Sequence, residues 1–63
     1  MENLKKIKDL IELISVDTYK ATAKGNHSAA IRARKNAQKI KELIGPFRKE
    51  ILVEIRKYDD SKN

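Results

Sequence analysis

The chain has 63 residues, no cysteine, and 15 lysines and arginines against nine acidic residues, which gives a net charge of +6 at pH 7. This length allows one small domain, and neither a disulfide nor a cysteine-based zinc site can stabilise it. A chain this short buries only about 60% of its unfolded surface, so oligomerisation is the remaining common route to stability. The basic balance favours an acidic partner.

An apolar stripe at helical spacing runs through the first third of the chain. Its members are spaced alternately by three and four residues: Leu4, Ile7, Ile11, Ile14, Thr18 and Ala21. This heptad spacing predicts a helix over about residues 3–24. Glu2 or Asn3 could serve its N-terminus, and Gly25 is a natural left-handed stop.

The second half of the chain repeats the same spacing after a short turn at residues 25–26. Asn26 or Ser28 can cap a second helix over about residues 27–58. Its apolar stripe consists of Ala30, Ala33, Ala37, Ile40, Ile44, Phe47 and Ile51. Because the two stripes match, we predict an all-α fold, a single antiparallel two-helix hairpin with heptad packing over residues 1–63. The polar residues 59–63 are expected to fray.

One proline interrupts the second helix. Pro46 has no N–H to offer the carbonyl of Glu42, and its ring crowds the preceding turn. The apolar periodicity nevertheless continues through it, since Phe47 and Ile51 stay in phase with Ile40. We therefore predict a helix that is kinked near Pro46, with a true break as the alternative.

The second helix is predicted to be about two turns longer than the first. Its overhang, about residues 52–58, has no cover within the same chain, and a symmetric partner could supply it. Three further apolar residues lie off the first stripe: Leu13, Val16 and Tyr19. They indicate either a contact with another subunit or isolated apolar residues on the surface. We predict a homodimer in a four-helix arrangement.

Positive charge is concentrated in one segment. From Lys24 to Lys49 there are eight basic residues and a single acidic one, Glu42, so this segment carries +7 and the rest of the chain −1. On a helical projection these cations lie opposite the alanine stripe, as Arg32 does, or along its border. An ordinary solvated helix surface is the alternative interpretation. The predicted nucleic-acid-binding residues are Lys24, Arg32, Arg34, Lys35, Lys39, Lys41, Arg48 and Lys49.

The residue types on this surface favour phosphate contacts. Lysine and arginine on an exposed helix bind phosphates, which sets affinity without selecting a sequence. Aromatic residues for stacking on unpaired bases are few: Tyr19, Phe47 and Tyr58. We therefore predict non-specific binding of duplex DNA. The alternatives are a coiled-coil interaction module whose basic face meets an acidic protein, and a small hairpin that binds RNA, for instance on the ribosome.

Nothing in the sequence supports catalysis, a cofactor or a metal site. His27 has no carboxylate or nucleophile at motif spacing, and a capping or phosphate-contacting role suits it better. The pair Asp59-Asp60 is expected only to aid solubility. There is no apolar run of membrane-spanning length and no signal-peptide core. We expect a cytoplasmic protein that is not an enzyme.

Residues 24–35, KGNHSAAIRARK, resemble the KGN-x-x-A-(A/G)-x-R-(A/V)-R-K core of the small histone H1-like proteins of Bacteroidetes, similar to the Hc1 family. Residues 42–44 and 47–49 are similar to the LEKL…FRK stretch of that family. The resemblance implies a DNA-binding, chromatin-like protein of the nucleoid. It implies these DNA contacts: Lys24, Arg32, Arg34, Lys35, Arg48 and Lys49.

The chain departs from the family pattern in two places. Gly45-Pro46 stands where the family usually has charged residues that favour a helix, which bears on the continuity of the second helix. The lysine- and alanine-rich tail of the longer chlamydial relatives is missing. Strong condensation of DNA by a disordered tail is therefore not implied.

Overall fold

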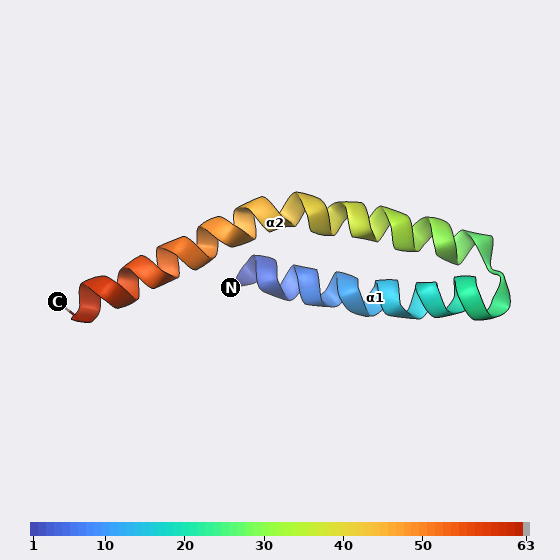
Figure 1. Cartoon of the computed structure of the whole chain (residues 1–63), viewed down its shortest axis with the longest axis horizontal. Helices are drawn as coiled ribbons and strands as arrows, with labels where there is room; N and C mark the ends of the chain where they lie inside the picture. Colours follow the sequence, from blue (N-terminus) through green and yellow to red (C-terminus); the bar gives the residue numbers. More distant parts are fainter. Residues whose placement is uncertain (63) are drawn as a thin grey trace.

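The chain folds into two antiparallel helices joined by a tight turn (Figure 1). The computed structural model describes the backbone of residues 1–62 and the side chains of residues 1–58. Helix α1 spans Glu2–Lys24 and helix α2 spans His27–Lys62, and there is no strand in the described backbone. The predicted all-α fold of two packed helices is confirmed. Helix α2 ends at Lys62, four residues beyond the predicted end near residue 58. The predicted fraying of residues 59–63 stays a prediction, and Asn63 lies outside the described residues.

The turn between the helices is built by two residues. Gly25 ends α1 in the left-handed region, at φ 64° and ψ 28°, and the Asn26 N–H donates a hydrogen bond to the Lys20 carbonyl at 3.2 Å. The Asn26 side-chain oxygen then accepts the Ala29 N–H at 3.1 Å. Gly25 is thus the left-handed stop that the sequence predicts, and Asn26, one of the two candidate residues, caps α2.

The N-terminus of α1 is capped from the other helix. Met1 makes no side-chain capping bond, and the Asn3 N–H donates to a carboxylate oxygen of Glu50 at 3.3 Å. A carboxylate at this position also complements the positive end of the helix dipole. The sequence-based expectation that Glu2 or Asn3 would provide the acceptor is wrong, because the antiparallel arrangement brings Glu50 of α2 to this end.

The seam between the helices follows a heptad repeat. Six positions agree with the predicted stripes and are buried or half-buried: Ile7, Ile14, Ala21, Ala33, Ile40 and Phe47. The other seam positions, which we call the inner register, are also buried or half-buried: Asn3, Leu10, Asp17, Ala29, Asn36, Leu43 and Glu50. Each of these residues comes one position before the residue that the sequence predicts for the seam.

The predicted residues at those positions lie to one side of the seam. We call them the outer register: Leu4, Ile11, Thr18, Ala30, Ala37, Ile44 and Ile51. Five of the seven are exposed, Ile11 at 50% and Ile44 at 41%. The inner and outer registers both repeat every seven residues and differ by one position, which is a rotation of about 100° around the helix. Heptad spacing alone therefore fits either line. Leu4 and Ala30 of the outer register are half-buried. The predicted seam therefore holds in one of its two lines and is shifted by one residue in the other, where Asp17 and Glu50 find polar partners on the opposite helix.

Helix α2 is continuous through Pro46, so the alternative of a true break is wrong. Phe47 lies half-buried in the seam directly after the proline, and the predicted kink stays a prediction. Beyond Glu50, α2 extends past the N-terminus of α1 and gives the molecule an elongated outline of 56 × 16 × 13 Å (Figure 1). Leu52 and Ile55 on this overhang are each 52% exposed.

Candidate nucleic-acid interface

All eight predicted binding residues have exposed side chains. Seven of them lie on α2, and Lys24 lies in the last turn of α1, where a cation suits the negative end of the helix dipole. Among the described residues, seven of the eight make no ion pair and are available to an external anion; Arg32 is the exception. The fold therefore presents one densely basic helix against a first helix of nearly balanced charge.

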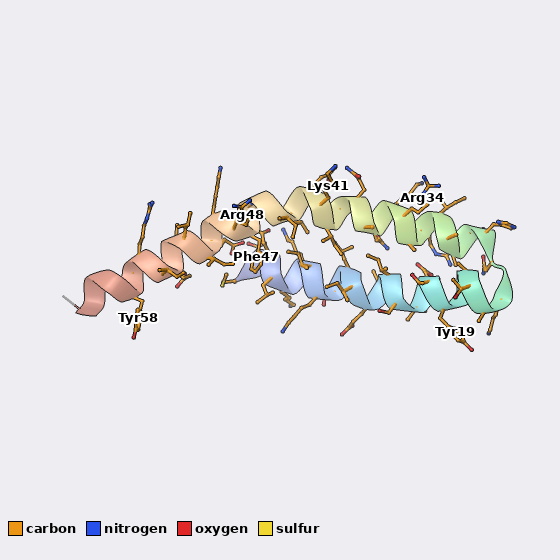
Figure 2. The ribbon with its side chains drawn as sticks, in the orientation of Figure 1. Tyr19, Arg34, Lys41, Phe47, Arg48 and Tyr58 are labelled. Atoms are coloured by element: carbon orange, nitrogen blue, oxygen red, sulfur yellow. The ribbon has the colours of Figure 1, made fainter. Side chains whose placement is uncertain are left out.

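The most regular part of this surface is a row of three cations, which we call the basic row: Arg34, Lys41 and Arg48. Figure 2 shows Arg34 and Lys41 on the side of α2 that faces away from α1, and the heptad spacing places Arg48 on the same line of the helix. Their spacing of seven residues corresponds to steps of about 10.5 Å along the helix axis. This step is close to the Debye length of about 8–10 Å at physiological salt, so each cation can neutralise a phosphate almost independently.

Two further cations sit beside the basic row and along the seam. Lys35 borders a shallow depression on the outer face of α2 with Ile31 and Arg34. Lys39 overhangs an open groove beside the seam, whose apolar floor includes Leu10 and Leu43. Both lysines are exposed, so they extend the basic surface sideways from the row.

Arg32 is placed differently from the other cations. The sequence predicts Arg32 opposite the alanine stripe, but its side chain reaches back to Asp17 of α1. Its Nη2 lies 3.1 Å from Oδ1 of Asp17, and its Nε lies 3.4 Å from both carboxylate oxygens. The Asp17 side chain is only 11% exposed, and the Arg32 side chain is 51% exposed. The expected orientation of Arg32 is therefore wrong, because the buried carboxylate of Asp17 on α1 attracts its guanidinium.

Asp17 and Glu50 are polar seam residues that the sequence prediction missed. Both belong to the inner register, and both contact the opposite helix. The sequence does contain one indication of this pairing. Asp17 and Arg32 are almost equally far from the turn at Gly25, so an antiparallel hairpin places them side by side on the two helices. Apolar character alone favours the outer register, which does not contain Asp17, and so it does not reveal this pairing.

The aromatic side chains do not contribute to the basic surface. Phe47 is half-buried and points toward α1, whereas Tyr19 lies on α1 and is 62% exposed on the opposite side of the molecule (Figure 2). Tyr58 lies ten residues beyond Arg48, on the overhang. A surface of cations without aromatic rings suits phosphates better than the stacking of unpaired bases.

Other kinds of site are poorly represented in the described part of the chain. The described side chains, those of residues 1–58, contain no group of three or more His, Cys, Asp or Glu residues that could hold a metal ion. Neither helix, as described, combines the length and the apolar character that a membrane span requires. Cations on one face of α2 are the chemically distinctive feature.

Comparison with known proteins identifies one family. The family model of the histone H1-like protein Hc1 matches residues 1–57. The chain belongs to the histone H1-like Hc1 family. No curated protein and no solved structure matches it. Membership of this family implies DNA as the partner and association with the nucleoid, and the family is not a family of enzymes.

Proposed function

We propose that this Hc1-family protein binds duplex DNA through phosphate contacts, with little preference for sequence, and helps to organise or compact a bacterial nucleoid. One observation carries the proposal: eight exposed cations lie within residues 24–49, where Glu42 is the only acidic residue. Folding places most of them on one helix, away from the seam. Such a surface supplies electrostatic affinity and the ability to slide along DNA.

Duplex DNA is favoured over single strands and over an acidic protein. The basic surface has no aromatic ring for stacking, which single-strand binding relies on. It also lacks the buried apolar anchors that dominate protein–protein affinity. Its cations are instead spaced along one long helix, which suits an extended polyanion. Structured RNA offers the same phosphate chemistry and is the competing ligand that the binding experiment must include.

We further propose that the protein acts as a homodimer in a four-helix arrangement, packed through the outer register. The chain alone has a thin core: Ile7 and Ala29 are the only buried apolar residues in the described part. Four of the seven inner-register residues are polar, whereas Thr18 is the only polar residue of the outer register. An exposed heptad line that is more apolar than the occupied one suits another helical hairpin.

The occupant best suited to the outer register is a second copy of this chain. The outer register lies directly beside the seam, so a second hairpin packed there would extend the same core rather than create a separate one. The overhang of α2 would find cover in the same assembly. Two basic surfaces in one dimer would also double the number of phosphate contacts.

The proposed function is tested by a salt titration of binding to unrelated DNA duplexes. Neutralising the basic row, by Arg34→Gln, Lys41→Gln and Arg48→Gln together, removes three contacts per chain. Each lost contact should make the slope of log K against log salt shallower by about 0.9, or by about twice that when both chains of a dimer contribute. Folding should be preserved, because exposed charges contribute little to stability.

A matched control separates local contacts from net charge. The triple variant Lys5→Gln, Lys8→Gln and Lys20→Gln removes the same charge from exposed positions on α1. It should weaken binding much less than the basic-row variant. Equal effects of the two variants would overturn the assignment of the surface. Tighter binding to structured RNA than to duplex DNA at the same salt would replace DNA as the ligand.

A further inference from the structure

One acidic residue stands out because it is nearly buried in a basic protein. Asp17 is 7% exposed as a whole residue, and its side chain lies in the seam between α1 and α2. It is the only buried charged residue in the described part of the chain. Its carboxylate is held by Arg32, one of the cations predicted to contact DNA.

We propose that Asp17 is a positioning residue that withholds Arg32 from the DNA phosphates, so that Arg32 serves as an interhelical clamp. The inference rests on the proposed function of the basic surface. It divides the exposed cations into two classes, of which only the seven unpaired ones bind the polyanion. Asp17 thereby limits affinity, although it lies inside the seam.

The geometry explains why the guanidinium is committed to Asp17. Nε and Nη2 of Arg32 both approach the carboxylate, at 3.4 and 3.1 Å, which is the forked arrangement that arginine forms with carboxylates. A lysine in this place would offer only a point charge. The fork also restricts the rotation of α2 relative to α1, because it joins a fixed position on each helix.

The energy balance favours retention of this pair when DNA arrives. A phosphate could offer Arg32 an anionic partner comparable to the carboxylate. Moving Arg32 to the phosphate would, however, leave the carboxylate of Asp17 charged and unpaired at 11% exposure. An uncompensated buried charge is strongly unfavourable, whereas an exposed cation such as Arg34 gains a phosphate without any such loss. Arg32 therefore stays with Asp17.

The charges of the pair also cancel at the distance of the DNA. A bound phosphate beside Arg32 would lie within a Debye length of the Asp17 carboxylate and would feel both charges. Because the pair has no net charge, a phosphate bound beside it would release few of the counterions condensed on the DNA. A charge-neutral replacement of the pair should consequently leave DNA binding as it was, which is not expected for any unpaired cation of the surface.

The experiment is a double-mutant cycle read by the salt slope of duplex binding. Asp17→Asn keeps an oxygen that can accept from Arg32 but removes the charge that holds it. This variant should bind duplex DNA several-fold more tightly, with a slope steeper by about 0.9 for each chain. The double variant Asp17→Asn, Arg32→Gln should return to the affinity and slope of the wild type.

Two controls complete the cycle. Glu12→Gln makes the same charge change at an exposed residue of α1 and measures the general effect of net charge; its gain should be smaller than that of Asp17→Asn. Arg34→Gln removes an unpaired cation and should weaken binding. Circular dichroism of every variant checks folding, and a loss of stability alone would not steepen the salt slope.

The outcomes distinguish the inference from the function on which it rests. If the double variant loses as much affinity as Arg34→Gln, then Arg32 does contact phosphate and the inference is wrong while the DNA-binding function stands. The same conclusion follows if Asp17→Asn gains no more than Glu12→Gln. If Arg34→Gln binds duplex DNA like the wild type, the proposed DNA-binding surface is wrong, and the inference about Asp17 loses its basis.

Discussion

At the scale of single residues, the two glycines of this chain have opposite roles. Gly25 occupies the left-handed region at φ 64°, whereas Gly45 lies inside α2 with ordinary helical geometry. Apart from chain neighbours and, at Gly45, the adjacent backbone of its own helix, a Cβ atom at either position would meet no atom within 4 Å. Substituting alanine at the two sites therefore changes only backbone conformational energies, without any packing clash.

This contrast predicts opposite effects of the same substitution. Gly25→Ala should destabilise the hairpin by about 1–2 kcal/mol, because an L-residue in the left-handed region carries that conformational cost. Gly45→Ala should stabilise it by up to about 1 kcal/mol, because alanine is a better helix former. Urea denaturation of the two variants and the wild type checks both signs. A stabilising Gly25→Ala would show that the turn does not require the left-handed conformation.

Individual residues also show what could be predicted from the sequence. Gly25 and Asn26 were identified because turn and cap chemistry is local and depends on residue type. Glu50 at the N-terminus of α1, and the pairing of Asp17 with Arg32, depend on which residues the hairpin brings to the same level. From the sequence alone, a carboxylate is expected on the surface, because its partner on the other helix is not apparent.

At the scale of elements, the heptad spacing was predictable but its register was not. Ile7 and Ile40 satisfy both possible registers, so apolar periodicity alone could not decide between the neighbouring lines. Apolar character alone favours the outer register, which is the expected seam of a monomer with a single interface. The structure occupies the more polar line instead, and this difference leaves the apolar line available for a second interface.

The second feature at this scale is the proline within α2, Pro46. Helix α2 continues through the proline, so replacing it restores a backbone donor and removes a steric conflict without creating a new element. Pro46→Ala should raise helicity and stabilise the protein by up to about 3 kcal/mol if the site relaxes fully. Circular dichroism and thermal melting measure both quantities.

The variant Pro46→Gly is the matched control for this prediction. It also restores the N–H, but glycine is about 1 kcal/mol less favourable than alanine in a helix interior, so its gain should be smaller by that amount. Lower stability in both variants would mean that the native packing of Phe47 depends on a bend imposed by the proline.

At the scale of the whole molecule, stability, assembly and binding depend on one division of surfaces. The seam occupies one side of α2, the basic row lies away from α1, and the outer register lies beside the seam. Arg34 is a helical neighbour of Ala30 and Ala37, so a second chain packed against the outer register would have the basic row along its rim. The family match accounts for the nature of the ligand, whereas assembly has to be argued from the exposed apolar residues.

The last prediction tests this assembly. Ile44→Asp places a charge in the middle of the outer register, where burial against a second chain would cost several kcal/mol. The wild type should sediment as a dimer whose melting temperature rises with protein concentration, because association stabilises by mass action. Ile44→Asp should be a monomer with a lower, concentration-independent melting temperature. Ile31→Asp makes the same change at a residue that is 53% exposed and outside both registers, and it should remain dimeric. A wild-type protein that sediments as a well-folded monomer at every micromolar concentration would refute the dimer, and dissociation by Ile31→Asp alone would move the interface to the outer face of α2.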